Sequence, residues 1–185
     1  SSYAERPSKL FNGVEKRLTI WVSKKSVSPD ANHKLYVSRY RRWLGEERSF
    51  LFESLRYTDG SSSPRLVTDA IPKISSEIEL KILSKLSSNK KLNNYFERYT
   101  RYRLFYTRKL RYFISFLDVI PRILDQQGNK LEPTELKSLF FSSEKYRDMA
   151  LSVLNSSLFF WFFCVHSDVR NVNKREIEAF PFSLD

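Results

Sequence analysis

The 185-residue chain contains few of the residues on which nucleotide-binding and metal-binding motifs depend. Its four glycines are far apart, at positions 13, 45, 60 and 128, so no glycine-rich loop that cradles phosphates can be written. The two histidines, His33 and His166, have no cysteine or histidine neighbour at metal-ligand spacing, and each is expected at the surface or at a helix end. The sequence therefore predicts neither a dinucleotide-type loop nor a metal site.

Cysteine is nearly absent as well. Cys164, the single cysteine, lies inside an apolar run, which excludes a disulfide framework and indicates a buried small side chain. Because disulfides are rare in reducing compartments and no signal peptide opens the chain, we expect a cytoplasmic protein. The chain begins at Ser1 without a methionine, in a segment that reads as structured, and we expect it to be a piece of a longer protein.

The densest apolar run lies near the end of the chain. Residues 158–165 are eight consecutive apolar residues, five of them aromatic, and they must be buried to avoid a large exposed patch. The nearly apolar segment 149–165 is interrupted at Ser152 and at residues 155–157, and it falls short of the roughly 20 residues of a membrane-crossing helix. We expect a long core helix that begins at Ser143, and no membrane partner.

A polar turn follows this run. Its candidate recognition residues are Asp168, Arg170, Asn171 and Asn173. Asn173 has Glu176 three positions later, the spacing of a helix capping box, and Pro181 would end the short helix. A buried helix that leads into a tightly specified polar turn can hold that turn rigidly at a surface. The alternative is a plain connection between two helices.

Alternation predicts strands in the first third of the chain. Residues 18–22 alternate between β-branched or aliphatic and other side chains, and residues 35–43 and 50–57 are two more strand-like runs. Residues 24–33, rich in Ser and Lys, predict a linker, where we place the main boundary. A helix is expected over residues 75–86, with Ser75 or Ser76 as its cap.

The apolar stripe of that helix is expected to contain Ile78, Ile82 and Leu86, widened by Leu80 and Leu83. Farther along, residues 102–107 and 111–117 predict paired strands, residues 125–133 a turn or hairpin loop, and residues 137–141 a last short strand. Strands, helix, strands and helix in this order predict an α+β or mixed fold. We expect small antiparallel or mixed sheets packed with the long C-terminal core helix.

The chain is strongly basic, with 32 Lys and Arg against 21 Asp and Glu and a net charge of +11. Such a balance favours polyanionic partners. The basic side chains form two groups, Arg39, Arg41 and Arg42, and Arg98, Arg101, Arg103, Arg108, Lys109 and Arg111. In the second group, eight Tyr or Phe residues lie among the cations, and no acid follows Glu97 before Asp118. Nucleic-acid binding explains this pattern, and so does a half-buried strand whose arginines face water.

The two ends of the chain resemble a known family. SSYAERPSKLFNGVEKRLTI, residues 1–20, and LNSSLFFWFFCVHSDVRNVNKREIEAFPF, residues 154–182, resemble segments of the Eco57I-like adenine-N6 DNA methyltransferases of type IIG and related bacterial restriction-modification systems. In that family the first segment closes the catalytic domain, and a target-recognition domain follows it. The resemblance implies that residues 1–24 end a catalytic domain and that residues 34–185 are a DNA target-recognition domain.

The resemblance also implies roles for residues near the amino end. Enzymes of this family flip adenine out of the duplex, and an aromatic side chain in the last conserved catalytic segment stacks on it. Phe11 resembles that residue, and Arg6 and Lys9 would lie near the flipped nucleotide or its phosphates. The alternative for Phe11 is a loop aromatic packed on the sheet. The S-adenosylmethionine-binding segment and the Asn-Pro-Pro-Tyr-type catalytic segment of the family are not in this chain.

These observations predict the DNA-binding, target-recognition part of an adenine-N6 DNA methyltransferase, with no cofactor in this fragment and S-adenosylmethionine in the parent protein. Its expected partners are double-stranded DNA and the upstream catalytic domain. One alternative is a metal-dependent nuclease module, because Pro29-Asp30 and Glu79-Leu80-Lys81 match part of a nuclease pattern, although Glu79 is expected in mid-helix. Another is a protein-interaction domain whose basic face meets an acidic partner.

Overall fold

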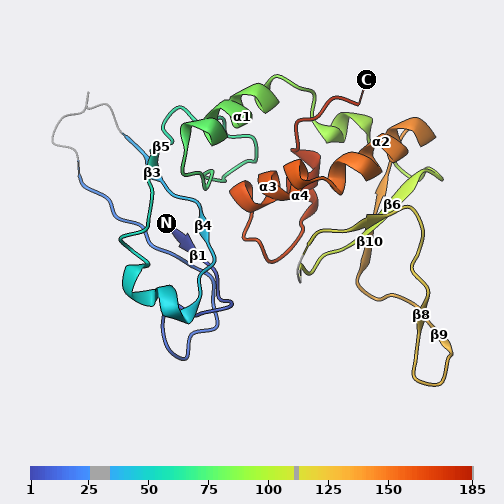
Figure 1. The fold of residues 1–185 in the computed structure, drawn as a ribbon. Helices are drawn as coiled ribbons and strands as arrows, with labels where there is room; N and C mark the ends of the chain where they lie inside the picture. The colour runs from blue at the N-terminus through green and yellow to red at the C-terminus, as the bar shows by residue number, and fades with distance from the viewer. Residues whose placement is uncertain (26–33, 111–112, 185) are drawn as a thin grey trace. The chain divides into compact units, whose positions relative to one another are not determined.

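The computed structural model describes residues 1–25, 34–110 and 113–184, and Figure 1 shows its ribbon. Small sheets and short helices alternate along the chain, which confirms the α+β class. The chain divides into two compact units, Ser1–Ser88 and Asn89–Asp185. We describe each unit by itself.

The first unit is built around a three-stranded sheet with the order β2-β1-β4. Strand β1 (Ser2–Tyr3) pairs antiparallel with β2 (Leu18–Thr19) and parallel with β4 (Tyr40–Arg41). A small core of this unit buries Tyr3 of β1 together with Leu10, Trp43 and Leu51. A second pair, β3 (Tyr36–Val37) with β5 (Thr58–Asp59), runs antiparallel. The strand expected at residues 18–22 is present, but its ladder is shorter.

The boundary expected at residues 24–33 does not divide the compact units. Strand β1 precedes that segment and β4 follows it, yet the two are neighbours in one sheet, and the division falls after Ser88. Residues 26–33 lie outside the described part of the chain. The assignment of residues 1–24 and 34–185 to two parental domains stays a prediction.

The prediction of a strand over residues 50–57 is wrong. A 3-10 helix, η1 (Gly45–Phe50), occupies its start, and turn hydrogen bonds continue, with the Ser54 amide donating to the Phe50 carbonyl oxygen at 2.9 Å. The Glu47 carboxylate accepts the Leu44 amide at 2.7 Å and so caps the first turn. This local capping favours a helical turn, which buries Leu51 and leaves Phe50 and Phe52 exposed.

Helix α1 (Glu77–Ser87) confirms the helix predicted near residues 75–86, and Ser76 is its cap. Its buried face differs from the predicted stripe, because Ile78 is 69% exposed while Glu79, Leu83 and Leu86 are buried. The reason is the Glu79 carboxylate, which accepts the Ser75 amide at 2.8 Å and therefore must face inward. Glu79 belongs to the first helical turn and not to mid-helix.

The second unit contains a three-stranded antiparallel sheet with the order β10-β6-β7. Its strands are β6 (Arg103–Thr107), β7 (Phe116–Leu117) and β10 (Leu136–Phe140). The pairing of β6 with β7 and the final strand β10 confirm the predicted strands, but β7 covers only the end of the range predicted at 111–117, of which residues 111–112 lie outside the described part of the chain. Leu104, Phe105 and Tyr106 are buried in succession, so both faces of β6 are covered and only its ends carry exposed side chains.

A hairpin, β8 (Ile123–Leu124) with β9 (Lys130–Leu131), confirms the loop predicted at residues 125–133. Asp125 organises its turn, because one carboxylate oxygen accepts the amides of Gln127 and Asn129 at 2.9 and 2.7 Å. The other oxygen accepts the Asn129 side-chain amide at 3.0 Å. Gly128 has φ +84, a conformation that a side chain at that position would strain.

The long C-terminal helix predicted from Ser143 is two helices. Helix α2 (Glu144–Leu154) begins at the Ser143 cap, and α3 (Ser157–His166) begins at the Ser156 cap after a bend of 70°. No single helix in the described ranges is long and apolar enough to cross a membrane; only the bent pair of α2 and α3 passes that test, by length and composition alone. Asn155 occupies the break and ends α2.

Helix α3 supplies the aromatic core of the second unit. Phe159, Phe162 and Phe163 are fully buried, and the rings of Phe159 and Phe162 lie 5.1 and 5.0 Å from that of Phe180. His166 ends the helix, as predicted, but it is buried and not at the surface. Cys164, predicted to be buried, is only half-buried. Helix α4 (Lys174–Glu178) and the 3-10 helix η2 (Leu92–Tyr95) complete the unit.

Candidate nucleic-acid interface

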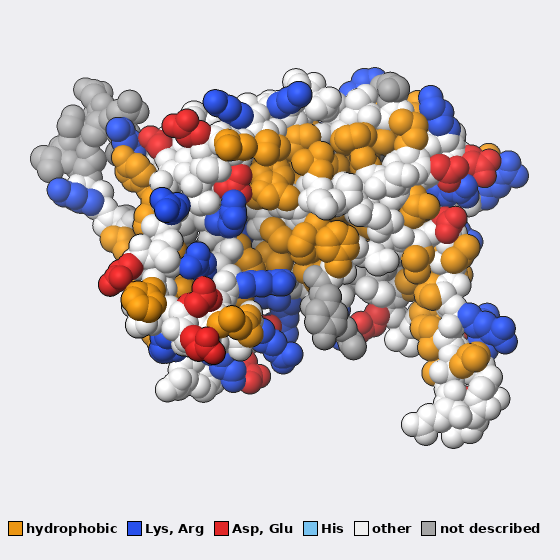
Figure 2. Space-filling view, in the orientation of Figure 1, with side chains coloured by type: hydrophobic (Ala, Val, Ile, Leu, Met, Phe, Trp, Pro, Cys, Tyr) orange, Lys and Arg blue, Asp and Glu red, His pale blue; other side chains and the backbone are white. Residues whose placement is uncertain are grey.

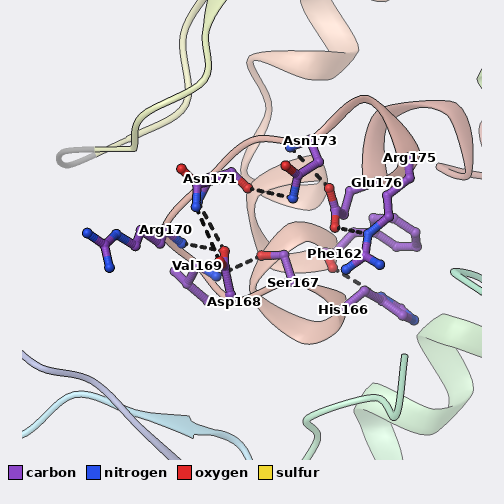
Figure 3. A network of polar contacts seen from close by, with 10 residues as sticks. All are labelled: Phe162, His166, Ser167, Asp168, Val169, Arg170, Asn171, Asn173, Arg175 and Glu176. Carbon is purple, nitrogen blue, oxygen red and sulfur yellow. Dashed lines mark hydrogen bonds and ion pairs between the residues drawn. The ribbon is translucent and has the colours of Figure 1, made fainter. Parts of the chain in front are cut away.

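The polar turn after α3, residues 167–173, is held by its own side chains (Figure 3). Ser167 Oγ accepts the Val169 amide at 2.9 Å. Asp168 Oδ1 accepts the amides of Arg170 and Asn171 at 2.8 and 3.0 Å, so this carboxylate satisfies two backbone donors at once. Most of the polar atoms of the turn are thus used within it. The Arg170 side chain extends away from the turn in Figure 3 and is exposed.

The backbone of this turn is strained at Val169. Its φ is 56°, in the left-handed region that β-branched residues rarely occupy, and its side chain is buried. Ser167 and Asp168, the two residues before Val169, hold this conformation by accepting the amides of Val169, Arg170 and Asn171. Backbone strain of this kind persists only where the surroundings over-determine it, and it is frequent at binding sites. The sequence carries no signal for it, because Val has no intrinsic preference for positive φ.

Two backbone hydrogen bonds tie the turn to the residues that follow β6. The Leu110 amide donates to the Arg170 carbonyl oxygen at 2.9 Å, and the Val172 amide donates to the Arg108 carbonyl oxygen at 2.7 Å. Lys109 and Asn171 are directly opposite each other in this antiparallel bridge. The fold therefore joins the end of the predicted basic segment to the predicted recognition turn, although some 60 residues separate them in the sequence.

We call the set Arg108, Lys109 and Arg170 the turn cluster. All three side chains are exposed. Lys109 Nζ lies 2.6 Å from Glu135 Oε1, so part of its charge is balanced by an acid that precedes β10. The ion pair with Glu135 could not be predicted from the neighbouring sequence, because no acid lies between Glu97 and Asp118. The arginines are consequently the stronger candidates for phosphate or base contacts.

A buried carboxylate fixes the far end of the turn. Glu176 is fully buried, and its Oε2 accepts the Asn173 amide at 3.1 Å while its Oε1 accepts Arg175 Nε at 2.7 Å. The reach from Glu176 back to the start of α4 is the contact expected from the predicted capping box. Asn173 also donates its side-chain amide to the Asn171 carbonyl oxygen at 3.4 Å. Asp168, Asn171 and Asn173 therefore hold the turn, and Arg170 is the member whose side chain is presented outward.

The remaining members of the second basic group lie at the opposite end of β6. Arg98, Arg101 and Arg103 are exposed and precede or begin the strand. The Arg101 guanidinium donates to the Tyr102 hydroxyl at 3.0 Å, which raises the pKa of Arg101 further above its ordinary value. The Arg103 guanidinium lies 5.3 Å from the centre of the Phe105 ring. Arg111 lies outside the described residues.

The first basic group does not form one exposed cluster. Arg39 lies 3.3 Å from Glu79, and the half-buried Arg41 donates to Ser54 Oγ at 2.6 Å. Arg42 is exposed. These contacts give Arg39 and Arg41 structural roles within the first unit. Glu79 is likewise engaged by the Ser75 amide and by Arg39, as a helix-capping side chain is.

The amino-terminal candidates lie on a loop of the first unit. Phe11 is 56% exposed, so it is not packed on the sheet. Arg48 fixes the loop, because its guanidinium donates to the carbonyl oxygens of Lys9 and Leu10 at 3.1 and 3.0 Å. Arg6 is exposed, whereas Lys9 Nζ lies 2.6 Å from Glu15 Oε1. An exposed aromatic ring on a fixed loop can stack on a planar ligand.

Figure 2 shows many apolar side chains at the surface among the Lys and Arg side chains. In the described parts of the chain, His, Cys, Asp and Glu side chains form no group of three that could hold a metal ion. Pro29 and Asp30, which belong to the nuclease alternative, lie outside those parts. Comparison with protein-family models, curated proteins and solved structures found no match to this chain.

Proposed function

We propose that this chain is the DNA-binding, target-recognition portion of a site-specific adenine-N6 DNA methyltransferase of a bacterial restriction-modification system. Methyl transfer would take place in an upstream catalytic domain of the parent protein, which would also bind S-adenosylmethionine in the cytoplasm. The role of the present chain would be to hold duplex DNA and to contribute to the choice of sequence.

The observation that carries the proposal is the turn cluster. Two segments distant in the sequence are joined by an antiparallel bridge, in which the carbonyl oxygens of Arg108 and Arg170 each accept a backbone hydrogen bond from the other segment, so the main chain of both arginines is fixed. Arginine on a fixed main chain suits bidentate contacts to phosphates or to guanine edges. The net charge of +11 and the resemblance of both chain ends to the methyltransferase family point the same way.

The proposal is tested by measuring the affinity of the chain for duplex DNA as a function of salt. A protein that neutralises phosphates releases counterions, so log K should fall linearly with log salt. Replacing both Arg108 and Arg170 by Ala should weaken binding and reduce the slope by roughly one for each phosphate contact removed. The charge-matched control removes the exposed Lys16 and Lys81 instead and should leave the slope nearly unchanged.

Two results would contradict the proposal. A flat salt response, or no binding of duplex DNA at low salt, would remove DNA as the partner. Equal losses in the Arg pair and in the Lys pair would show that net charge alone matters and that the turn cluster has no special role. For the parent enzyme, Phe11→Ala should abolish the 2-aminopurine fluorescence increase that accompanies base flipping, and its full retention would withdraw the stacking role of Phe11.

A further inference from the structure

Tyr99 combines an exposed aromatic ring with a strained backbone. Its side chain is 91% exposed, and its φ is 57°. A bulky residue in the left-handed region is an outlier that Gly or Asn would occupy at lower cost. Burial of the ring does not explain this backbone conformation. In the described part of the chain, the aromatic ring that contacts Tyr99 is that of Phe140, and the two ring centres are 6.3 Å apart. A costly conformation that places a large ring in water calls for another reason.

The loop that carries Tyr99 is clamped on both sides to the end of β10. The Glu97 amide donates to the Phe140 carbonyl oxygen at 3.0 Å before Tyr99, and after it the Phe141 amide donates to the Tyr102 carbonyl oxygen at 2.9 Å. Thr100 Oγ1 adds a bond of 2.7 Å to the Phe141 carbonyl oxygen. The ring is therefore presented on a fixed main chain, which lowers the entropy lost when a ligand binds it.

Two basic residues lie close to Tyr99 in the sequence. Arg98 and Arg101 are exposed on either side in the sequence, and the Arg101 guanidinium packs 5.0 Å from the centre of the Tyr102 ring. Glu144 is the acid that acts on Arg101, and its carboxylate is already engaged by Arg147 at 3.1 Å. An exposed aromatic ring with exposed arginines one and two positions away in the sequence suits a nucleobase and its adjoining phosphates, because a base can stack on the ring while guanidinium groups bind phosphate oxygens.

We propose that Tyr99 is a base-stacking residue, with Arg98 and Arg101 as the phosphate contacts of the same nucleotide step. The ligand is an unstacked base of the bound DNA. This inference rests on the proposed function, because it requires DNA to be the partner. It adds a second contact region to the turn cluster, at the opposite end of β6.

The experiment measures the affinity of the full chain for a fluorescently labelled DNA duplex and for one of its single strands, across a salt series. Tyr99→Ala should weaken binding by about five- to a hundredfold, the range of a lost base-aromatic stack, with the salt slope unchanged. Tyr99→Phe keeps the ring and should bind within about twofold of the unaltered chain. Arg98→Ala with Arg101→Ala should reduce the salt slope instead. Tyr57→Ala, which removes another exposed ring, is the matched control and should bind normally.

A stability measurement separates recognition from structure. Tyr99→Gly relieves the backbone strain, so the thermal midpoint should rise while the affinity falls as in Tyr99→Ala. A lower midpoint together with lower affinity would show a structural role and would overturn the proposal. It would be overturned equally if Tyr99→Ala bound normally, or if Tyr99→Phe bound as weakly as Tyr99→Ala. In those cases, salt-dependent DNA binding by the unaltered chain would leave the proposed function intact. If the unaltered chain did not bind DNA, both the role of Tyr99 and the proposed function would be overturned.

Discussion

Asn155 connects the break between α2 and α3 to the sheet of the second unit, and its removal is the sharpest test of the fold. Its side-chain Oδ1 accepts the Phe116 amide at 2.9 Å, and its Nδ2 donates to the Phe116 carbonyl oxygen at 3.0 Å. One amide side chain thus pairs both polar groups of a β7 residue, as a neighbouring strand would. Nδ2 also donates to the Leu151 carbonyl oxygen at 2.9 Å, near the end of α2.

The size of the expected loss of stability follows from the two backbone groups that Asn155→Ala leaves without partners. Phe116 is 2% exposed, so its amide and carbonyl would lose their partners away from water. Each orphaned buried group costs about 1–3 kcal/mol. Asn155 itself is exposed, and water that enters from its side would offset part of this cost. We therefore expect Asn155→Ala to lower the free energy of unfolding by roughly 2–3 kcal/mol.

Two further variants sharpen the test. Asn155→Asp keeps the acceptor for the Phe116 amide but replaces the donor by an oxygen that faces a carbonyl, so its cost should approach that of Ala. Asn94→Ala removes an exposed amide of the same unit and should change stability by less than about 0.5 kcal/mol.

Urea unfolding followed by circular dichroism gives the free energies, and hydrogen exchange of the Phe116 amide reports the local effect. If Asn155→Ala were as stable as Asn94→Ala, with the Phe116 amide still protected, the pairing would not hold the helices to the sheet.

Two other predictions concern the turns. Glu176→Ala should destabilise the second unit by about 2–4 kcal/mol, because it removes a charge-assisted contact to Arg175 and leaves the Asn173 amide without its carboxylate. Glu176→Gln should destabilise the unit less than Glu176→Ala. Urea unfolding of the two variants measures both changes. Hydrogen bonds from Asn129, and then from Gln127 and Gly128, hold the pKa of Asp125 below its ordinary value. The ionised carboxylate therefore favours the hairpin above the ordinary Asp pKa, and this contribution is lost as the pH falls through the lowered pKa. An NMR titration of Asp125 and its hairpin amides would show the two changes at the same low pH, whereas an ordinary Asp pKa would contradict the turn geometry.

Short-range patterns predicted much of the fold. The caps at Ser76 and Ser143 and the short helix after Asn173 follow from residues within a few positions of one another. The pairing of β6 with β7 joins residues that are still near in the sequence, such as Tyr106 with Phe116. Such local signals survive because hydrogen bonds between near neighbours form whatever surrounds them.

The error at residues 50–57 came from a local cap, the Glu47 carboxylate on the Leu44 amide. Other errors came from places where contacts between residues distant in the sequence decide. Ile78 was expected inside α1, but Glu79 turns inward to meet Ser75 and Arg39, and the helix rotates with it. The long helix breaks at Asn155 because that side chain has a partner on β7, which no periodicity reveals. Of the candidate interface, the sequence identified Arg170 and Arg108, but neither the backbone pairing of their two segments nor the ion pair of Lys109 with Glu135 could be predicted from it.

The basic segment around β6 has exposed arginines and a residue with positive φ at or near each of its two ends. Arg103 begins β6 and Arg108 follows its end five residues later, so at roughly 3.3 Å per residue of extended strand their main chains are about 17 Å apart. Each end has a residue in the left-handed region, Tyr99 at one and Val169 at the other, and each has exposed arginines on a fixed main chain. Under the proposed function, two cationic ends held about 17 Å apart would span the major groove of B-DNA, which is about 12 Å wide, and their arginines would contact phosphates on both sides of it. The paired strand between the two ends would then set their spacing, so the buried residues of β6 and the exposed cations at its ends would serve the same contact.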